Sequence, residues 1–268
     1  MTRAKREHRD LGRGKWIDQS DAHRQLVEIV GHYSAGTHAL PSPFFPPPPM
    51  AQVVVGPASD GPLGTRVVDL TFPSEYIPFL AEARATYARV QENDTAHVRL
   101  WSGGGAGRPT IVLLHGWAGG NQRITAYAFG VTYWLRHGFD VASFVLPFHG
   151  ARAPGSSGAL FPSRDPRYTN EGFGQAIFDL RALAMFLRAR GASAVGAIGM
   201  SLGGYTTALW ASVAGPEEIG GLDFAVGMIP AVSFSRLMWR LGEHSPTRKQ
   251  AVSAGITEDL LADAFAVH

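Results

Sequence analysis

The 268-residue chain contains no cysteine, which excludes both a disulfide framework and catalysis by a thiolate. No apolar run approaches the roughly 18 residues that cross a bilayer, and no signal-peptide core follows the charged start. The 24 basic and 22 acidic side chains leave a net charge of only +2, too little to indicate a nucleic-acid ligand. We therefore expect a cytoplasmic protein without a membrane span or a nucleic-acid partner; the oligomeric state stays open.

Motifs for metals and nucleotides are also missing. Without cysteine, and without an H-E-x-x-H or H-x-x-x-H pair, a metal site has no support. The glycine-rich stretch 103–107 is not followed by a phosphate-binding fingerprint of the G-x-G-x-x-G or G-K-[ST] type. We expect no metal and no cofactor, and a nucleotide-dependent enzyme is disfavoured.

Three segments differ in composition. Residues 1–65 form a basic, proline-rich N-terminal extension, in which 41–49 is predicted to be an extended polyproline spacer. Residues 66–232 alternate between strand-like and helix-like patterns, and 233–268 is expected to begin a helical lid or connecting segment. Alternation of strands and helices specifies an α/β fold, with a mostly parallel sheet covered by helices on both faces.

Apolar periodicity gives the elements of the middle segment. The predicted strands are 66–72, 97–101, 110–114, 140–146, 194–198 and 222–229, and the predicted helices are 79–90, 124–136, 171–190 and 205–213.

The most informative motif is G-x-S-x-G, formed by Gly199-Met200-Ser201-Leu202-Gly203. It lies between the predicted strand 194–198 and the predicted helix 205–213, where a sharp turn exposes the serine at the end of a sheet. Glycine is needed at both ends because a side chain there would collide as the chain doubles back. The Ser201 hydroxyl is the candidate nucleophile, provided that a base takes its proton.

A second motif supplies hydrogen-bond donors. The strand 110–114 ends in His115-Gly116-Trp117-Ala118-Gly119-Gly120, and a glycine-rich turn leaves backbone N–H groups free for a developing oxyanion. We expect the N–H of Trp117 as one donor. The N–H of Leu202, at the start of the helix after the nucleophile, is expected as the second.

The two motifs together resemble the α/β-hydrolase superfamily. Leu113-Leu114-His115-Gly116-Trp117 is followed about 85 residues later by Gly199-Met200-Ser201-Leu202-Gly203-Gly204, in the order that the superfamily shows. Leu146 to Arg152 resembles the loop after the next strand, so the likeness covers about residues 66–232. It implies an esterase-, lipase- or peptidase-like enzyme that forms an acyl-enzyme from a small ester or amide. In the superfamily the histidine of the strand-HG motif is structural, so we expect a structural role for His115. For His149 we expect a structural or substrate-lining role.

A catalytic acid and histidine are not evident. The superfamily order is Ser, then Asp or Glu, then His, and only His244 and His268 follow Ser201. Asp223 begins its strand, which places it ~20 Å from the nucleophile at ~3.3 Å per residue. Glu243 adjoins His244 and makes a poor orienting partner, and Glu258, Asp259 and Asp263 fall in a helical pattern.

We therefore predict a C-terminally truncated hydrolase. Its sheet is expected to lack the last two strands and to leave an exposed apolar edge. Without an acid and a base, the chain is expected to hydrolyse esters weakly or not at all. The alternative is a non-catalytic binding module of α/β-hydrolase type, in which Ser201 is a relic.

Overall fold

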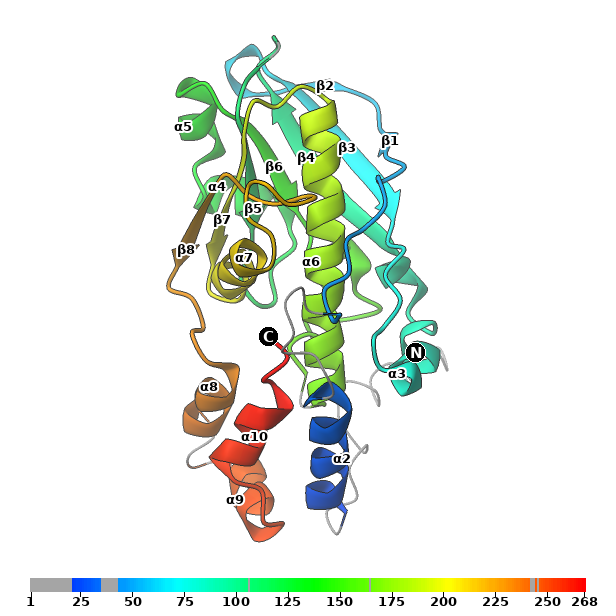
Figure 1. Cartoon of the computed structure of the whole chain (residues 1–268). Helices are drawn as coiled ribbons and strands as arrows, with labels where there is room; N and C mark the ends of the chain where they lie inside the picture. The colour runs from blue at the N-terminus through cyan, green and yellow to red at the C-terminus, as the bar shows by residue number, and fades with distance from the viewer. Residues whose placement is uncertain (1–20, 35–42, 106, 164, 242–243, 245) are drawn as a thin grey trace.

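One open β-sheet with helices on both faces forms the centre of the structure (Figure 1). A computed structural model describes residues 21–34, 43–105, 107–163, 165–241, 244 and 246–268. The strands lie in the order β1-β3-β4-β6-β5-β7-β8, and β2 pairs with β3. They are β1 (Val54–Val55), β2 (Ser59–Asp60), β3 (Arg66–Pro73), β4 (Thr95–Ser102), β5 (Thr110–Leu114), β6 (Asp140–Phe144), β7 (Val195–Met200) and β8 (Phe224–Met228).

The helices begin and end at local sequence signals. They are α2 (Ala22–Ser34), α3 (Ala81–Tyr87), α4 (Gln122–Ala128), α5 (Val131–Arg136), α6 (Pro166–Ala189), α7 (Leu202–Val213), α8 (Phe234–Leu241), α9 (Pro246–Ser253) and α10 (Glu258–Ala264), with short 3-10 helices at Pro62–Gly64, Gln91–Asp94 and Gly150–Arg152. The single helix predicted over 124–136 is two helices, because Gly130 adopts a left-handed φ of 60° between them. α6 begins before 171, since Asp165 caps it and Pro166 occupies its first turn.

The central strands are parallel and buried on both faces. β5 pairs in parallel with β6 and β7, and β7 with β8, whereas β3, β4 and β6 pair antiparallel. Every residue of β5 is buried. Its alternate side chains join two separate apolar clusters, one with α6 and α7 and the other with α5. The predicted α/β fold with helices on both faces of the sheet is confirmed; the sheet is mixed, and its parallel part consists of β6, β5, β7 and β8.

β8 forms one edge of the sheet among the described strands. Residues Ala225 to Gly227 are exposed, and the side chain of Val226 is 45% accessible.

None of the described helices is long and apolar enough to cross a membrane. The cytoplasmic location expected from the sequence stays a prediction.

The N-terminal extension is part of the folded body where it is described. Phe44 and Phe45 are buried in the main apolar cluster, and β1 pairs with β3. The interpretation of 41–49 as a spacer is therefore wrong for residues 43–49, because two large aromatic rings interrupt the prolines and bury against the core. The basic tail 1–15 lies outside the described residues.

A buried carboxylate ties this extension to α6. Glu171 is fully buried and accepts hydrogen bonds from the Tyr33 hydroxyl at 2.7 Å and the Tyr76 hydroxyl at 2.6 Å. The backbone N–H groups of Phe79 and Leu80 donate to the same carboxylate at 2.8 and 2.9 Å. Four donors satisfy a group that burial alone would disfavour, and one of them comes from α2.

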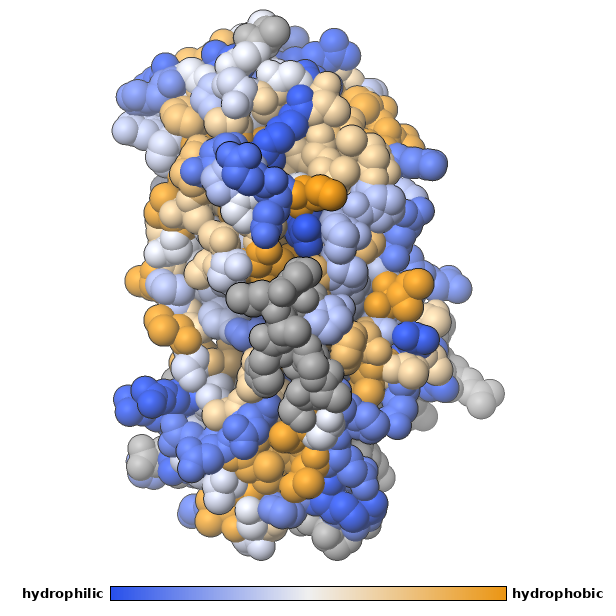
Figure 2. All heavy atoms as spheres, in the orientation of Figure 1, coloured by the Kyte–Doolittle hydropathy of each residue, from blue (hydrophilic) through white to orange (hydrophobic). Residues whose placement is uncertain are grey.

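A layer of helices lies beyond the carboxyl ends of the parallel strands (Figure 1). It consists of α2, α8, α9 and α10, and α10 packs against both α2 and α8. Figure 2 shows an apolar area low on the same face, over this layer. The Asn170 amide of α6 donates to the carbonyl oxygen of Ala264 at 2.8 Å. That 233–268 begins a lid stays a prediction.

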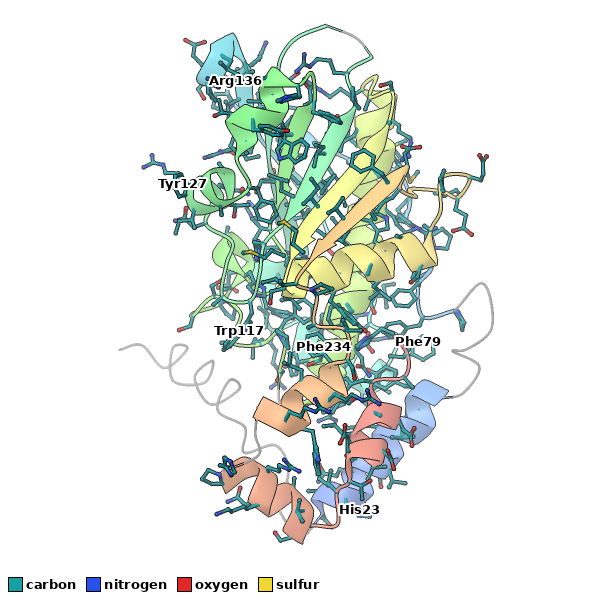
Figure 3. The ribbon with its side chains drawn as sticks, turned by 90° about the vertical axis from the view of Figure 1, so that its left-hand side faces the viewer. His23, Phe79, Trp117, Tyr127, Arg136 and Phe234 are labelled. Atoms are coloured by element: carbon teal, nitrogen blue, oxygen red, sulfur yellow. The ribbon has the colours of Figure 1, made fainter. Side chains whose placement is uncertain are left out.

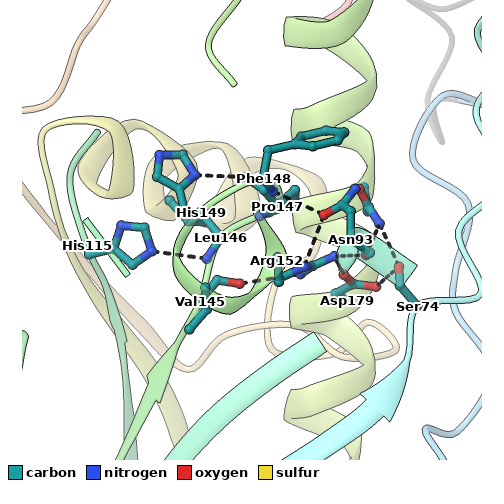
Figure 4. A network of polar contacts seen from close by, with 11 residues as sticks. Ser74, Asn93, His115, Val145, Leu146, Pro147, Phe148, His149, Arg152 and Asp179 are labelled. Atoms are coloured by element: carbon teal, nitrogen blue, oxygen red, sulfur yellow. Dashed lines mark hydrogen bonds and ion pairs between the residues drawn. The ribbon is translucent and has the colours of Figure 1, made fainter. Parts of the chain in front are cut away.

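An ion pair without solvent contact lies under the loop after β6 (Figure 4). The Arg152 guanidinium contacts the Asp179 carboxylate at 2.8 Å, with side-chain exposures of 0% and 1%. Arg152 also donates to the side-chain and backbone oxygens of Asn93, and the Ser74 hydroxyl donates to Asp179. The Phe148 N–H donates to the Asn93 side chain at 3.1 Å. The network thus fixes the loop that begins at Leu146.

Replacing one partner of this pair leaves the other charge buried and uncompensated. We expect Arg152→Met to lower the free energy of unfolding by about 3–5 kcal/mol. Arg99→Met is the matched control, because its pair with Asp69 is on the surface and is worth about 1 kcal/mol or less. Urea denaturation of both variants measures the difference. Equal losses would contradict the structural role of the buried pair.

Candidate active site

Ser201 occupies a strained turn between β7 and α7. Its φ of 55° and ψ of −113° are rare for a residue with a side chain. Its N–H donates to the carbonyl of Met228 on the neighbouring strand, and its carbonyl accepts from the N–H of Tyr205. A Cβ on Gly203 would collide with the carbonyl groups of Leu114 and His115. Only glycine lets the first turn of α7 pack so closely on the end of β5.

The turn after β5 lies directly against this elbow. A Cβ on Gly116 would be 3.6 Å from the Cβ of Ser201, and the N–H of Gly119 closes the turn on the carbonyl of Gly116 at 3.0 Å. Among the described residues, no group accepts a hydrogen bond from the N–H of Trp117 or of Leu202. Both predicted donors are therefore free of acceptors in the described part of the chain, and their catalytic roles stay predictions.

The loop after β6 fastens this turn from outside. The Ser157 hydroxyl donates to the carbonyl of Gly119 at 2.5 Å and accepts from the N–H of Gly150 at 2.9 Å. The indole N–H of Trp117 donates to the carbonyl of Gly158 at 2.8 Å. Sequence analysis did not single out Ser157, because a serine in a Ser-Ser-Gly turn carries no signal of a partner 38 residues away.

His115 is committed to the backbone through both ring nitrogens. Nδ1–H donates to the carbonyl of Gly116 at 2.8 Å, and Nε2 accepts from the N–H of Leu146 at 3.1 Å (Figure 4). This pattern requires a neutral ring. Burial lowers its pKa to about 4. The ring joins the turn after β5 to the loop after β6 and has no nitrogen left for Ser201.

His149 lies beside His115, with 5.0 Å between the ring centroids. Its Nδ1–H donates to the carbonyl of Pro147 at 2.8 Å. Its Nε2 is buried and has no hydrogen-bond partner among the described residues. Burial, together with the neighbouring His115, lowers its pKa to about 3. Gly158 covers Nε2, since a Cβ there would be 2.7 Å from this atom.

The two histidines after Ser201 are not placed as its base either. His268 is held by the Tyr205 hydroxyl at Nδ1, at 2.7 Å, and by the Asn170 side-chain oxygen at Nε2, at 3.1 Å. Burial lowers its pKa to about 3. His244 is exposed. Within the described part of the chain, no imidazole hydrogen-bonds to the Ser201 hydroxyl.

Asp223 immediately precedes β8, at the end of the strand where its sequence position predicted it. Its carboxylate accepts from Arg188 and from the N–H of Val195 at the opposite end of β7 from the elbow. The Asp223 carboxylate therefore stabilises the amino-terminal ends of β7 and β8, away from Ser201. No cluster of three or more metal-ligating side chains occurs within the described residues.

Solved structures with a similar fold are two acetyl xylan esterases. The protein from Paenibacillus sp. R4 is 12% identical with a TM-score of 0.53, over 99% of this chain and 78% of its own. Acetyl Xylan Esterase 1 from Thermoanaerobacterium sp. JW/SL YS485 is 13% identical with a TM-score of 0.52, over 90% of this chain and 72% of its own. The chain has the α/β-hydrolase fold. The resemblance seen in the sequence motifs is confirmed at the level of the fold.

No family profile matches the chain. Two curated relatives are the uncharacterised proteins MT2702 and Rv2627c of Mycobacterium tuberculosis, each 31% identical over 206 residues, or 75% of this chain. The chain spans about half of the length of these relatives, 48% in each case.

The contact of Ser157 with the turn after β5 is testable without any substrate. We expect Ser157→Ala to raise amide hydrogen exchange at Gly119, whose N–H closes the turn, at least about tenfold, because the turn loses one external anchor and opens locally. Ser156→Ala is the matched control, since Ser156 is exposed and no described group bonds to its hydroxyl. Hydrogen-exchange mass spectrometry measures both. Unchanged protection in Ser157→Ala would contradict the anchoring role.

The buried ring of His115 makes stability depend on pH. Because its folded pKa of about 4 lies below the unfolded value near 6.5, unfolding takes up a proton in this window and stability falls as the pH drops. At pH 4.5 we expect wild type to have lost about 2–3 kcal/mol more than His115→Gln, relative to pH 7. Urea denaturation at both pH values measures the difference. Equal losses would show that the ring protonates freely in the folded state.

Proposed function

We propose that the chain is a serine hydrolase in which the Ser201 hydroxyl attacks the carbonyl carbon of a small ester or amide. The C–O or C–N bond to the leaving group then breaks, and water releases the acid from the acyl-enzyme. The observation that carries the proposal is the left-handed turn at Ser201, which faces the turn after β5. Strain of this kind at a serine between a strand and a helix is characteristic of an exposed nucleophile.

Stabilisation of the oxyanion follows from the same geometry. Attack converts the carbonyl oxygen into an alkoxide, and the N–H groups of Trp117 and Leu202 are the proposed donors to it. Leu202 is the first residue of α7, so the positive end of the helix dipole adds to its donor. One such donor is typically worth about 10²–10³ in kcat.

The base limits the rate in this proposal. The rings of His115, His149 and His268 hydrogen-bond elsewhere and are neutral at pH 7. Proton transfer from Ser201 then falls to water, and enzymes stripped of their triad keep only about 10³–10⁴-fold acceleration. We therefore propose slow acylation of Ser201 and weak hydrolysis of activated esters by this chain.

The test measures the reactivity of the Ser201 hydroxyl separately from catalytic turnover. We expect a fluorophosphonate at high concentration to add one phosphonyl group to Ser201, as measured by intact mass and peptide mapping, and to add none to Ser201→Ala. With p-nitrophenyl acetate we expect turnover that is Ser201-dependent and within about 10⁴-fold of the uncatalysed rate.

Two outcomes would contradict the proposal in different ways. Equal labelling of wild type and Ser201→Ala would show that Ser201 is no nucleophile and would favour the non-catalytic binding module. Rapid, Ser201-dependent turnover would keep the nucleophile but show that a base operates, with His268 and His244 the first to replace.

A further inference from the structure

A polar groove lies apart from the Ser201 site, on the face of the sheet covered by α4 and α5. It encloses about 590 Å³ between α4, the segment from Pro57 to Pro62 and the outer faces of β3 and β4. This volume is in the range of small-molecule sites, roughly 300–1,000 Å³. Figure 3 shows Tyr127, on its rim, well above Trp117 and Phe234, which mark the carboxyl end of the sheet. None of the candidate catalytic residues lines the groove.

The charges that line the groove cancel. Arg99 and Asp69 form a bidentate ion pair, with both N–O distances at 2.7 Å. Asp60 and Arg123 also line the groove, and neither forms an ion pair with a described residue. Two carboxylates and two guanidiniums therefore give no net attraction for an ion. They do offer paired acceptors and paired donors, which match adjacent hydroxyl groups of a neutral ligand.

The side chain of Tyr127 lies at the rim of the groove and is largely exposed to solvent. Tyr127 is 90% exposed, although burial of such a ring is normally favourable. It follows Arg123 by four residues on α4, so the two side chains share one face of the helix. A flat, exposed ring beside hydrogen-bonding groups suits the C–H face of a sugar ring, which is apolar while its edge carries hydroxyls.

The floor of the groove has unmet hydrogen-bonding capacity. Gln122 lines it, and its amide N–H donates to the carbonyl of Ser143 at 3.1 Å. The side-chain oxygen of Gln122 is buried and has no hydrogen-bond partner among the described residues. Buried polar atoms are nearly always paired, so the described residues alone do not satisfy this oxygen.

We propose that this groove binds a neutral saccharide of one or two rings, stacked on Tyr127 and hydrogen-bonded by Asp60, Arg123 and the Asp69–Arg99 pair. The inference does not rest on the proposed hydrolase activity. It assigns to the chain a ligand site separate from Ser201.

The experiment titrates the whole chain with cellobiose, maltose and lactose, and follows binding by NMR chemical shifts and calorimetry. We expect saturable millimolar binding of at least one of these sugars, with shifts confined to α4, the start of α5, β3, β4 and the Pro57–Pro62 segment. Tyr127→Ala is expected to weaken it at least tenfold. Tyr133→Ala is the matched control, because Tyr133 is 57% exposed on α5 but does not line the groove, and its affinity should stay within twofold of wild type.

Further binding measurements test where the sugar binds and whether the groove prefers neutral sugars. Binding should be unchanged in Ser201→Ala, and Arg123→Gln should weaken it severalfold. Glucuronate and glucosamine, a charged acid and a charged amine, should bind more weakly than the neutral sugars. Absence of saturable binding by all three neutral sugars would overturn the proposal. So would equal affinities of Tyr127→Ala and Tyr133→Ala in well-folded variants, or tighter binding of either charged sugar.

Discussion

The close approach of α7 to the end of β5 is the constraint on which the site depends. Gly203 allows it, because any side chain there would strike the carbonyl groups of Leu114 and His115. Ser201 adopts its positive φ two residues before this contact, and the N–H of Leu202 has no acceptor among the described residues. This backbone contact brings the turn after β5 against Ser201, and in the proposed mechanism that turn and the start of α7 supply the two donors.

Support for this contact comes from groups buried on either side of it. His115 joins the turn after β5 to the loop after β6 through two backbone hydrogen bonds, and the Arg152–Asp179 pair fixes that loop against α6. Both use polar groups that burial makes costly unless every partner is present. Together they rigidify the site, and the two hydrogen bonds of His115 leave neither of its ring nitrogens free to act as a base. In the proposed mechanism, the described residues therefore supply the nucleophile and the donors more fully than they supply acid–base groups.

Local patterns in the sequence predicted the elements closely, because apolar runs and glycine positions act within a few residues. The β5 run and the G-x-S-x-G motif are examples, and the fold that they predicted is the one observed. Features that depend on distant partners were not predictable. Tyr33 reaches Glu171 across 138 residues of chain, and Ser157 reaches Gly119 across 38. The residue types at these positions do not identify the distant hydrogen-bond partner.

The most direct test of the central claim is a crystal structure of the chain with a methylphosphonyl group on Ser201. The geometry predicts a single adduct whose non-bridging oxygen lies 2.7–3.1 Å from the backbone nitrogens of both Trp117 and Leu202, the range for oxyanion donors. An adduct whose oxygen points away from both nitrogens would contradict the account. So would a structure in which reagent modifies another residue and leaves Ser201 free.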